Sequence, residues 1–271
     1  MEQQTSNLPD LNRLSVISAM VLLAYAVTPF IQIAAYPVQL QLPGILIAFQ
    51  LSFSTLTSLF AAALAGLGTD WLLRLHPRYA ETRASRHWLL PALTALVIGT
   101  PLNNLQMGPQ WWAVFAFGGF LLAIVCAAEY IASDPADPRR APMSGLLTAV
   151  SFALVLVLAV ALRGAGTRLF LVVPALSGAV FLTALRSLYL RLGERWIWTW
   201  SLAIALVIGE MAAGLYYWPV SALQYGLILL GPAYALTSIA SALEEGSTLR
   251  ASLLEPILML VAMWAISMVV H

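Results

Sequence analysis

The sequence predicts an all-α, polytopic membrane protein with about nine transmembrane helices and a cytoplasmic N-terminus. Three observations predict this class. First, 61% of the 271 residues are hydrophobic and 9% are charged, whereas soluble domains are about 45–50% apolar and about 25% charged. Second, apolar runs near the ~20 residues that a spanning helix needs recur along the chain. Third, the basic residues gather on alternate breaks between these runs, as the positive-inside rule requires.

Nine apolar runs qualify as spans, and polar or turn-forming breaks separate them. In chain order the runs are 14–34, 44–68, 88–107, 111–132, 143–162, 169–190, 196–217, 222–243 and 252–270. The breaks include PVQLQLPG at 37–44, SDPADPRRAP at 133–142, RGAGTR at 163–168 and EEGSTLR at 244–250. No soluble domain fits between the runs, so we expect a polar cytoplasmic segment at 1–13 and a single helical domain at 14–271. The last run is the shortest, and a re-entrant or interfacial position is an alternative for it.

The arginines orient the chain. All 13 basic residues are Arg. With the N-terminus in the cytoplasm, eleven of them fall on the cytoplasmic side, and only Arg163 and Arg168 fall outside. Aromatic residues agree with this threading, since Trp71, Trp88, Tyr130 and Trp196 then mark the inner interface and Trp111, Trp112, Tyr217 and Trp218 the outer one. The sequence therefore predicts a multi-pass protein of the cytoplasmic (inner) membrane.

Composition also excludes several classes of function. A net charge of +1 argues against nucleic acid as a partner, because such binding needs a basic face. The absence of Lys excludes a retinal Schiff base and a pyridoxal phosphate enzyme. Cys126 is the only cysteine, so no intrachain disulfide or thiolate metal cluster can form. His76 and His87 lie in a polar loop and His271 ends the chain, which leaves no buried haem site. We expect no metal and no cofactor.

One carboxylate, Glu210, lies inside an apolar run, in the stretch IGEMAAGLYYWP. It is about 21 Å past Trp196 along a helix that rises about 1.5 Å per residue, which places it in the outer third of a ~30 Å core. A charged carboxylate that faces lipid there costs several kcal/mol, so Glu210 should face the bundle or be neutral. It is either a proton, cation or head-group site, or a protonated residue that joins two helices.

Polar side chains at the same depth suggest a pocket around Glu210. They include Asn103, Asn104, Tyr217 and Gln224, which together with Glu210 form our candidate ligand-binding set. The alternative is that Tyr217 anchors the interface and that the amides cap helix ends.

Further polar residues favour structural roles. Asp70, Glu129 and Arg186 fall at the inner ends of three runs, where an ion-pair cluster is one interpretation and capping carboxylates beside a snorkelling Arg are the other. Glu255 precedes Pro256 in the first turn of the last run, where an acid favours the helix dipole. The face made by Gln50, Ser54, Thr57 and Ser58 fits helix packing better than a polar path.

Three motifs carry a family resemblance: TDWLLRLHP at 69–77, AEYIASDP at 128–135 and YYWPVSALQYGLILLGPAYAL at 216–236. Their order and spacing resemble those of an uncharacterised, domain-of-unknown-function family of bacterial multi-pass membrane proteins, found mainly in green non-sulfur bacteria. The resemblance implies a helical membrane protein and nothing about activity, so no catalytic residue is carried over.

Two functions remain from the sequence. Motifs of the GxSxG, HExxH, phosphate-loop and DxxxD kinds are missing, so we expect no enzyme. The first function is a non-catalytic membrane component, which is a subunit, a scaffold or a lipid- or pigment-binding protein in contact with lipid and other membrane proteins. The alternative is a transporter or binder of a small, largely apolar molecule with Glu210 as the proton or head-group site.

Overall fold

The structure is a computed structural model that describes residues 9–31, 33–42, 45–74, 87–134, 136–193, 195–248 and 252–270. Contacts within the chain divide it into two compact units, Met1–Ser133 and Asp134–His271, and each is described by itself. The boundary falls in the proline-rich break at 133–142. The single domain expected over 14–271 stays a prediction, and most of the expected N-terminal segment 1–13 lies outside the described residues.

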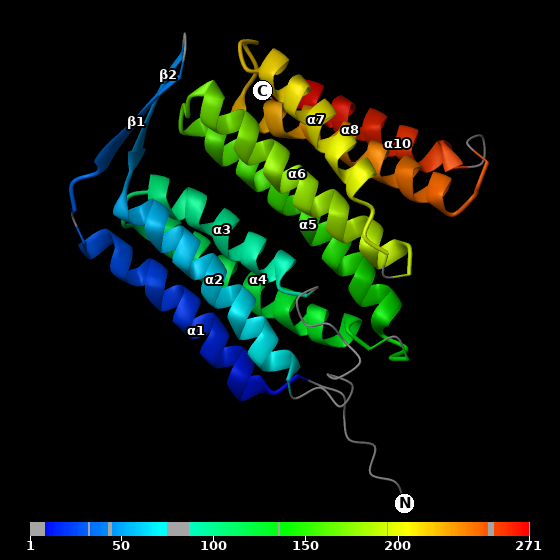
Figure 1. Cartoon of the computed structure of the whole chain (residues 1–271), viewed down its shortest axis with the longest axis horizontal. Helices are drawn as coiled ribbons and strands as arrows, with labels where there is room; N and C mark the ends of the chain where they lie inside the picture. The colour runs from blue at the N-terminus through cyan, green and yellow to red at the C-terminus, as the bar shows by residue number, and fades with distance from the viewer. Residues whose placement is uncertain are drawn as a thin grey trace, which may run out of the picture. The chain divides into compact units, whose positions relative to one another are not determined.

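The first unit contains four helices and a β-hairpin among its described residues (Figure 1). The helices are α1 (Leu11–Val27), followed by the 3-10 helix η1 (Thr28–Phe30), then α2 (Phe53–Leu73), α3 (Leu89–Asn104) and α4 (Pro109–Ala132). α2 packs between α1 and α3, and α4 packs against α3 and α1. Each helix contributes fully or nearly fully buried side chains to this core, among them Val21, Ala65, Val97 and Leu122.

Gly99 allows three of these helices to approach closely. The Tyr25 hydroxyl donates a hydrogen bond of 2.7 Å to the carbonyl oxygen of Ala95. A Cβ atom at Gly99 would lie 2.6 Å from the Tyr25 Oη atom and 2.6 Å from the Ser58 Oγ atom. Only a residue without a side chain fits there, and α1, α2 and α3 meet at this position.

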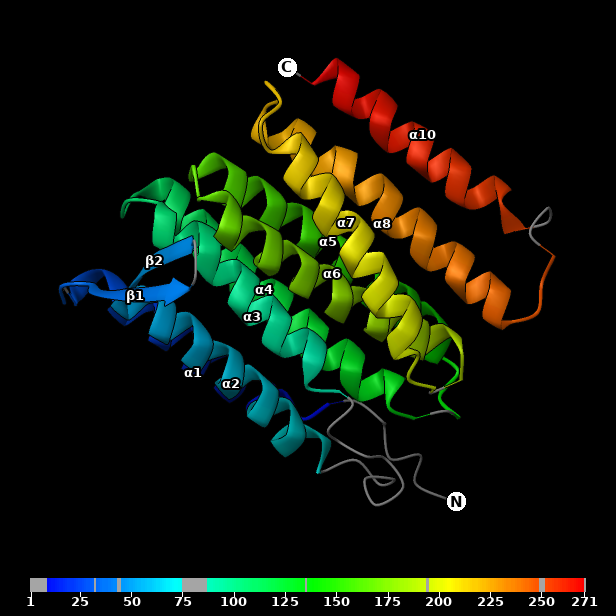
Figure 2. The same ribbon diagram turned by 45° about the horizontal axis from the view of Figure 1, so that its top comes forward.

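The hairpin corrects two boundaries predicted from the sequence. The runs 14–34 and 44–68 predict continuous helices, but α1 ends at Val27 and α2 begins at Phe53. Between them, β1 (Tyr36–Leu42) and β2 (Ile45–Leu51) pair in antiparallel fashion, with Tyr36 opposite Leu51 and Leu42 opposite Ile45. Figure 2 shows the two strands beside each other.

Local sequence explains both boundaries. Residues 38–42 read Val-Gln-Leu-Gln-Leu, and this alternation of apolar and polar residues has the period of two that favours a strand. The side chain of Ser52 accepts a hydrogen bond of 3.3 Å from the backbone N–H of Thr55, so Ser52 is the N-cap at which α2 begins. Hydropathy alone does not register either signal.

The second unit contains five helices among its described residues: α5 (Arg140–Gly164), α6 (Leu169–Arg191), α7 (Trp198–Leu215), α8 (Ala222–Glu244) and α10 (Leu254–Val269). α8 is central, because it packs against α5, α7 and α10, while α6 packs between α5 and α7. α10 packs closely on α8 at Gly231, where a Cβ atom would be in van der Waals contact with the backbone of Leu260 at 3.4 Å. The main contact of α10 is with α8 (Figure 2).

The nine predicted runs correspond one to one with the nine α-helices of the described residues, so the predicted class of helical membrane protein is confirmed. Seven of these helices are long and apolar enough to cross a membrane. The other two, α3 and α10, have 16 residues each. The run 88–107 is therefore longer than its helix, which ends at Asn104.

Contacts between helix ends indicate the relative directions of the helices within each unit. In the first unit, Arg13 at the start of α1 donates a 2.7 Å hydrogen bond to the Trp71 carbonyl at the end of α2, and its guanidinium lies 4.4 Å from the Trp71 ring centroid. In the second unit, Arg163 at the end of α5 donates to the carbonyls of Tyr216 (2.6 Å) and Trp218 (3.0 Å) after α7. α1 and α2 therefore run in opposite directions, and α5 and α7 run in the same direction, as expected for helices that alternate along the chain.

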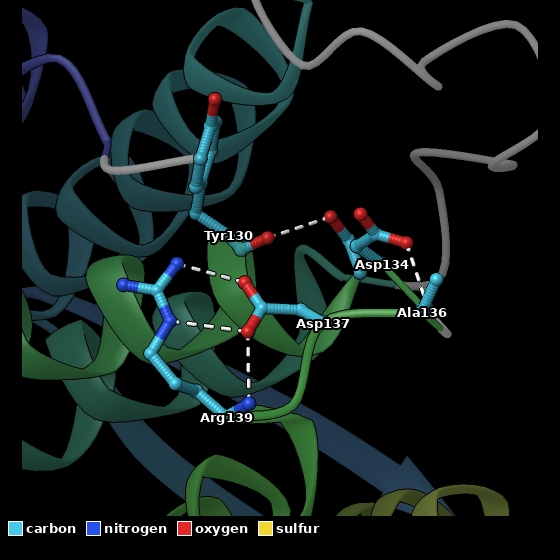
Figure 3. Close-up of polar contacts among 6 residues, drawn as sticks. Tyr130, Asp134, Ala136, Asp137 and Arg139 are labelled. Carbon is cyan, nitrogen blue, oxygen red and sulfur yellow. Dashed lines mark hydrogen bonds and ion pairs between the residues drawn. The ribbon is translucent and has the colours of Figure 1, made fainter. Parts of the chain in front are cut away.

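The break between α4 and α5 is ordered by its own side chains (Figure 3). The Ser133 hydroxyl donates to the Tyr130 carbonyl at 2.7 Å, and Asp134 accepts from the backbone N–H of Ala136 at 2.9 Å. Asp137 accepts from the backbone N–H of Arg139 at 2.8 Å and forms an ion pair with its guanidinium at 2.8 Å. The hydrogen bond to Asp137 raises the pKa of Arg139 above its ordinary value.

Candidate functional site

The two predicted asparagines lie in the first unit, where their side chains make different contacts. Asn103 Nδ2 donates to the Ser58 Oγ atom at 3.0 Å, and Asn103 lines a cavity of about 210 Å³ together with Tyr25 and Ser54. Asn104 Nδ2 donates to the Thr100 carbonyl of its own helix at 2.9 Å. Asn103 thus joins helices α2 and α3, whereas Asn104 caps the end of α3.

The other three predicted residues lie in the second unit. Glu210 is exposed on α7, makes no hydrogen bond or ion pair with the residues that the structure describes, and does not line the cavities described here. Tyr217 is 77% exposed beyond the end of α7. Gln224 forms a capping box with Ser221, in which its Oε1 atom accepts from the Ser221 backbone N–H at 2.8 Å. Within the second unit these residues form no common pocket around Glu210, which does not face the core of its own unit.

The structure shows one contact for each of the predicted inner charges. Asp70 forms an i, i+4 ion pair of 2.9 Å with Arg74 at the end of α2. Arg186 is buried in the second unit, with its guanidinium 5.2 Å from the ring centroid of Tyr189. Glu129 is buried in the first unit beside His87, a residue that the sequence assigned to a polar loop.

His87 and Glu129 form an enclosed polar pair. The His87 Nδ1 atom lies 2.8 Å from the Glu129 Oε2 atom, and the two side chains are 4% and 0% exposed. Nearby, the Thr69 hydroxyl lies 3.7 Å from the Cys126 Sγ atom. The contact between His87 and Glu129 joins the start of α3 to the end of α4. The described residues contain no group of three or more His, Cys, Asp or Glu residues that could hold a metal ion.

A groove of about 690 Å³ lies between α5, α8 and α10 in the second unit. Small residues of α5 form one wall, at a spacing of four: Ala141, Gly145, Ala149 and Ala153. Phe152 and Leu156 of α5, Leu230 of α8, and Met259 and Met263 of α10 add apolar surface. A Cβ atom at Gly145 would meet no atom within 4 Å, so this wall faces open space.

One end of this groove is charged. The Tyr234 hydroxyl donates a 2.5 Å hydrogen bond to the Glu255 Oε1 atom in the first turn of α10. The side chain of Arg191 at the end of α6 lies near the same hydroxyl. Arg191 and Tyr234 both line the groove, and Glu255 lies one helical turn before Met259, which also lines it. The arrangement is an apolar groove with a guanidinium and a carboxylate near each other at one end.

A second groove lies on the other side of α10. It has a volume of about 670 Å³, and its lining includes Trp218, Gln224, Ile228, Trp264 and Met268. The Trp264 Nε1 atom donates to the Ile228 carbonyl at 3.3 Å, which fixes α10 on α8 between the two grooves. This groove has no charged residue in its lining.

Comparison with known proteins places the chain in a family. The family model described as "Protein of unknown function (DUF5656)" matches residues 33–270. The chain belongs to the DUF5656 family. It is accordingly a multi-pass membrane protein of a family of unknown function, and the bacterial source expected from the resemblance stays a prediction. Neither the curated proteins nor the solved structures gave a match.

The DUF5656 match includes every residue of the groove and its charged end. Sequence reasoning did not find this site. Arg191, Tyr234 and Glu255 lie far apart in the chain, and Glu255 was interpreted only as a helix-dipole acid. The available signal was the stripe of small residues on α5, which leaves space along one helix face.

Proposed function

We propose that this DUF5656 protein is a non-catalytic membrane component that binds a membrane lipid in the groove between α5, α8 and α10. The observation that carries the proposal is an apolar groove of about 690 Å³ with a charged group at one end. A lipid has the same division into an apolar chain and a polar head. We also propose, from the sequence, that the protein is not an enzyme.

The dimensions of the groove suit an acyl chain. From Ala141 to Leu156, the α5 wall extends ~22 Å at the rise of an α-helix. One leaflet of a bilayer contributes half of a hydrocarbon core that is ~30 Å thick, or ~15 Å, so the wall is long enough for an acyl chain. An apolar groove within a membrane protein fills with hydrocarbon, because neither water nor a void is favourable against its walls.

The charged end distinguishes this groove from an ordinary gap between helices. Arg191, Tyr234 and Glu255 supply a cation, a hydroxyl and a carboxylate where the apolar walls begin. Ligand sites commonly combine a mostly apolar lining with a few converging polar groups of this kind. The groove on the other side of α10 has the apolar lining without the charges.

We also propose that the protein lies in the cytoplasmic membrane with its N-terminus inside. The distribution of arginine supports this orientation, and the antiparallel neighbours within each unit are compatible with it. Arg191 and Glu255 would then face the cytoplasmic leaflet. Contacts with other membrane proteins remain part of the proposal.

The alternative of a transporter that uses Glu210 gains no support from the geometry. Glu210 is exposed on α7 and lines neither groove of the second unit. A proton or head-group site in either groove would need other residues.

Lipid binding can be tested with a substitution that fills the groove with a side chain. Gly145→Leu places a side chain in the open space against the α5 wall, and Gly178→Leu on α6 is the matched control, since a Cβ there also meets no atom within 4 Å and the residue lines neither groove. Native mass spectrometry of the purified protein, first delipidated and then mixed with phospholipid, would count bound lipid. We expect Gly145→Leu to lose a bound lipid that wild type and Gly178→Leu retain. Equal lipid binding by all three proteins would contradict the proposal.

A further inference from the structure

We propose that the groove between α5, α8 and α10 selects a phospholipid whose head group carries both a phosphate and a primary ammonium group. This inference rests on the lipid binding proposed above and adds the class of head group. It follows from the pairing of opposite charges at the end of the groove.

The Tyr234 hydroxyl lies near both Arg191 and Glu255. A hydroxyl has one proton to donate, and Tyr234 donates it to the Glu255 Oε1 atom at 2.5 Å. Arg191 lines the groove together with Tyr234, and its guanidinium has donors only. The positive and the negative group thus both lie near the Tyr234 hydroxyl at the same end of the groove.

Both charges keep hydrogen-bonding capacity for a ligand. A guanidinium has several N–H donors in a planar fork that matches the oxygens of a phosphate. Glu255 uses one carboxylate oxygen for Tyr234 and makes no other hydrogen bond to the residues that the structure describes. Both side chains are exposed rather than enclosed by protein, so a head group can reach them.

Charge complementarity favours a zwitterionic head group. A head group with phosphate alone would gain from Arg191 but would bring its negative charge beside Glu255, and that repulsion reduces the gain. An ammonium group on the same head neutralises Glu255 and donates hydrogen bonds to it. A trimethylated ammonium carries the same charge but has no N–H to donate, so it fits this site less well.

The packing holds the three residues in place. The Tyr234 ring makes an edge-to-face contact with Phe152 of α5, with centroids 5.3 Å apart. Arg191 ends α6 and Glu255 begins α10, so a bound head group would connect three elements of the second unit. α10 packs mainly on α8, and a bound head group would add a contact between its first turn and α6.

The experiment compares three lipids with the same acyl chains: phosphatidylethanolamine, phosphatidylcholine and phosphatidylglycerol. The full-length protein is titrated with each lipid, and native mass spectrometry gives the apparent affinities. We expect phosphatidylethanolamine to bind about tenfold more tightly than either of the others, which is the effect of one charge-assisted hydrogen bond.

Variants separate the contributions of the two charges. Glu255→Gln should abolish the preference for phosphatidylethanolamine over phosphatidylglycerol. Arg191→Gln should lower the affinity for each of the three lipids by about tenfold. Glu244→Gln, an exposed acid at the end of α8 outside the groove, is the control and should change nothing. Thermal melting would verify that each variant is folded.

The outcomes distinguish the two proposals. If lipid binds and Gly145→Leu removes it, but Glu255→Gln keeps the wild-type order of affinities, the head-group inference is wrong and lipid binding stands. A preference for phosphatidylglycerol in the wild type would also overturn the inference. If no lipid binds to the wild type, both proposals fail.

Discussion

At the scale of single residues, His87 and Glu129 illustrate how a polar contact is maintained inside an apolar protein. Their side chains are 4% and 0% exposed, and a 2.8 Å contact joins them. A buried carboxylate or imidazole loses the hydration that it has in the unfolded chain, and a partner must replace it. The net stability that such a pair contributes is small, but removal of one partner destabilises the protein strongly.

We predict that His87→Ala and Glu129→Ala each destabilise the protein by about 2–5 kcal/mol, because each removes a contact that replaces the hydration of the other buried group. The free energy of unfolding of the double variant should fall by less than the sum of the two losses, since the contact between the two side chains is lost only once. Thermal melting in mild detergent measures both effects. Glu244→Gln is the control, because the exposed residue should keep its acceptor for Trp200 Nε1. Strictly additive losses would show that His87 and Glu129 do not depend on each other.

Glu210 gives a second prediction at this scale. It is exposed on α7 and has no partner among the described residues, so Glu210→Gln should leave thermal stability and the affinity for lipid unchanged. Glu210→Leu should be at least as stable as the wild type, because it removes a carboxylate from an apolar helix face. A marked loss of stability in Glu210→Leu would show that another molecule or segment uses this carboxylate.

At the scale of helices, glycine decides how closely neighbours approach. Gly99 has no room for a Cβ, whereas Gly178 faces open space. Both lie within helices, where replacing glycine with alanine reduces the backbone conformational entropy that is lost on folding. The two positions should therefore respond to the same substitution with opposite sign.

We predict that Gly99→Ala destabilises the protein by about 1–3 kcal/mol, because the new methyl group displaces Tyr25 from its bond to the Ala95 carbonyl. Gly178→Ala should be neutral or stabilising by up to about 1 kcal/mol. Thermal melting of the two variants side by side provides the comparison. Equal shifts in the same direction would contradict the packing described around Gly99.

The helices were largely predictable from the sequence, and the hairpin was not. Each of the nine apolar runs overlaps one helix, because a hydropathy window detects a long apolar segment of any kind. That window cannot tell a strand from a helix in a short run, and residues 45–51 were absorbed into the predicted span 44–68. The alternation at 38–42 and the cap at Ser52 carried the missing information.

The candidate site was less predictable than the fold, for a physical reason. Depth along a helix follows from residue number, so Glu210 could be placed at a level in the membrane, but the direction of its side chain depends on which neighbours pack against α7. The charged end of the groove joins Arg191, Tyr234 and Glu255, whose proximity depends on how α6, α8 and α10 cross. No spacing in the sequence encodes that proximity.

At the scale of the whole molecule, two compact units divide the chain near its midpoint, and the α4–α5 break between them contains the ion pair of Asp137 and Arg139. Positive charge at such breaks is what retains them in the cytoplasm during insertion. Orientation is therefore a property of the whole chain that charge counts predict and that labelling can measure.

We predict that a membrane-impermeant maleimide labels Ala165→Cys in intact cells and labels Thr248→Cys only after the membrane is permeabilised. Both positions are exposed in breaks between helices of the second unit. The wild-type protein is the control, because its single cysteine, Cys126, is buried. Labelling of Thr248→Cys in intact cells would reverse the proposed orientation.

The attachment of α10 mainly to α8 has a consequence for how the groove would fill. A site sealed within a bundle exchanges its contents through a gate, whereas a groove beside a peripheral helix exchanges sideways with the surrounding leaflet. Its occupancy then follows the mole fraction of the preferred lipid in that leaflet, not the total amount of lipid. The protein would consequently register local membrane composition, and the fraction of lipid-bound molecules would change along with the bilayer itself.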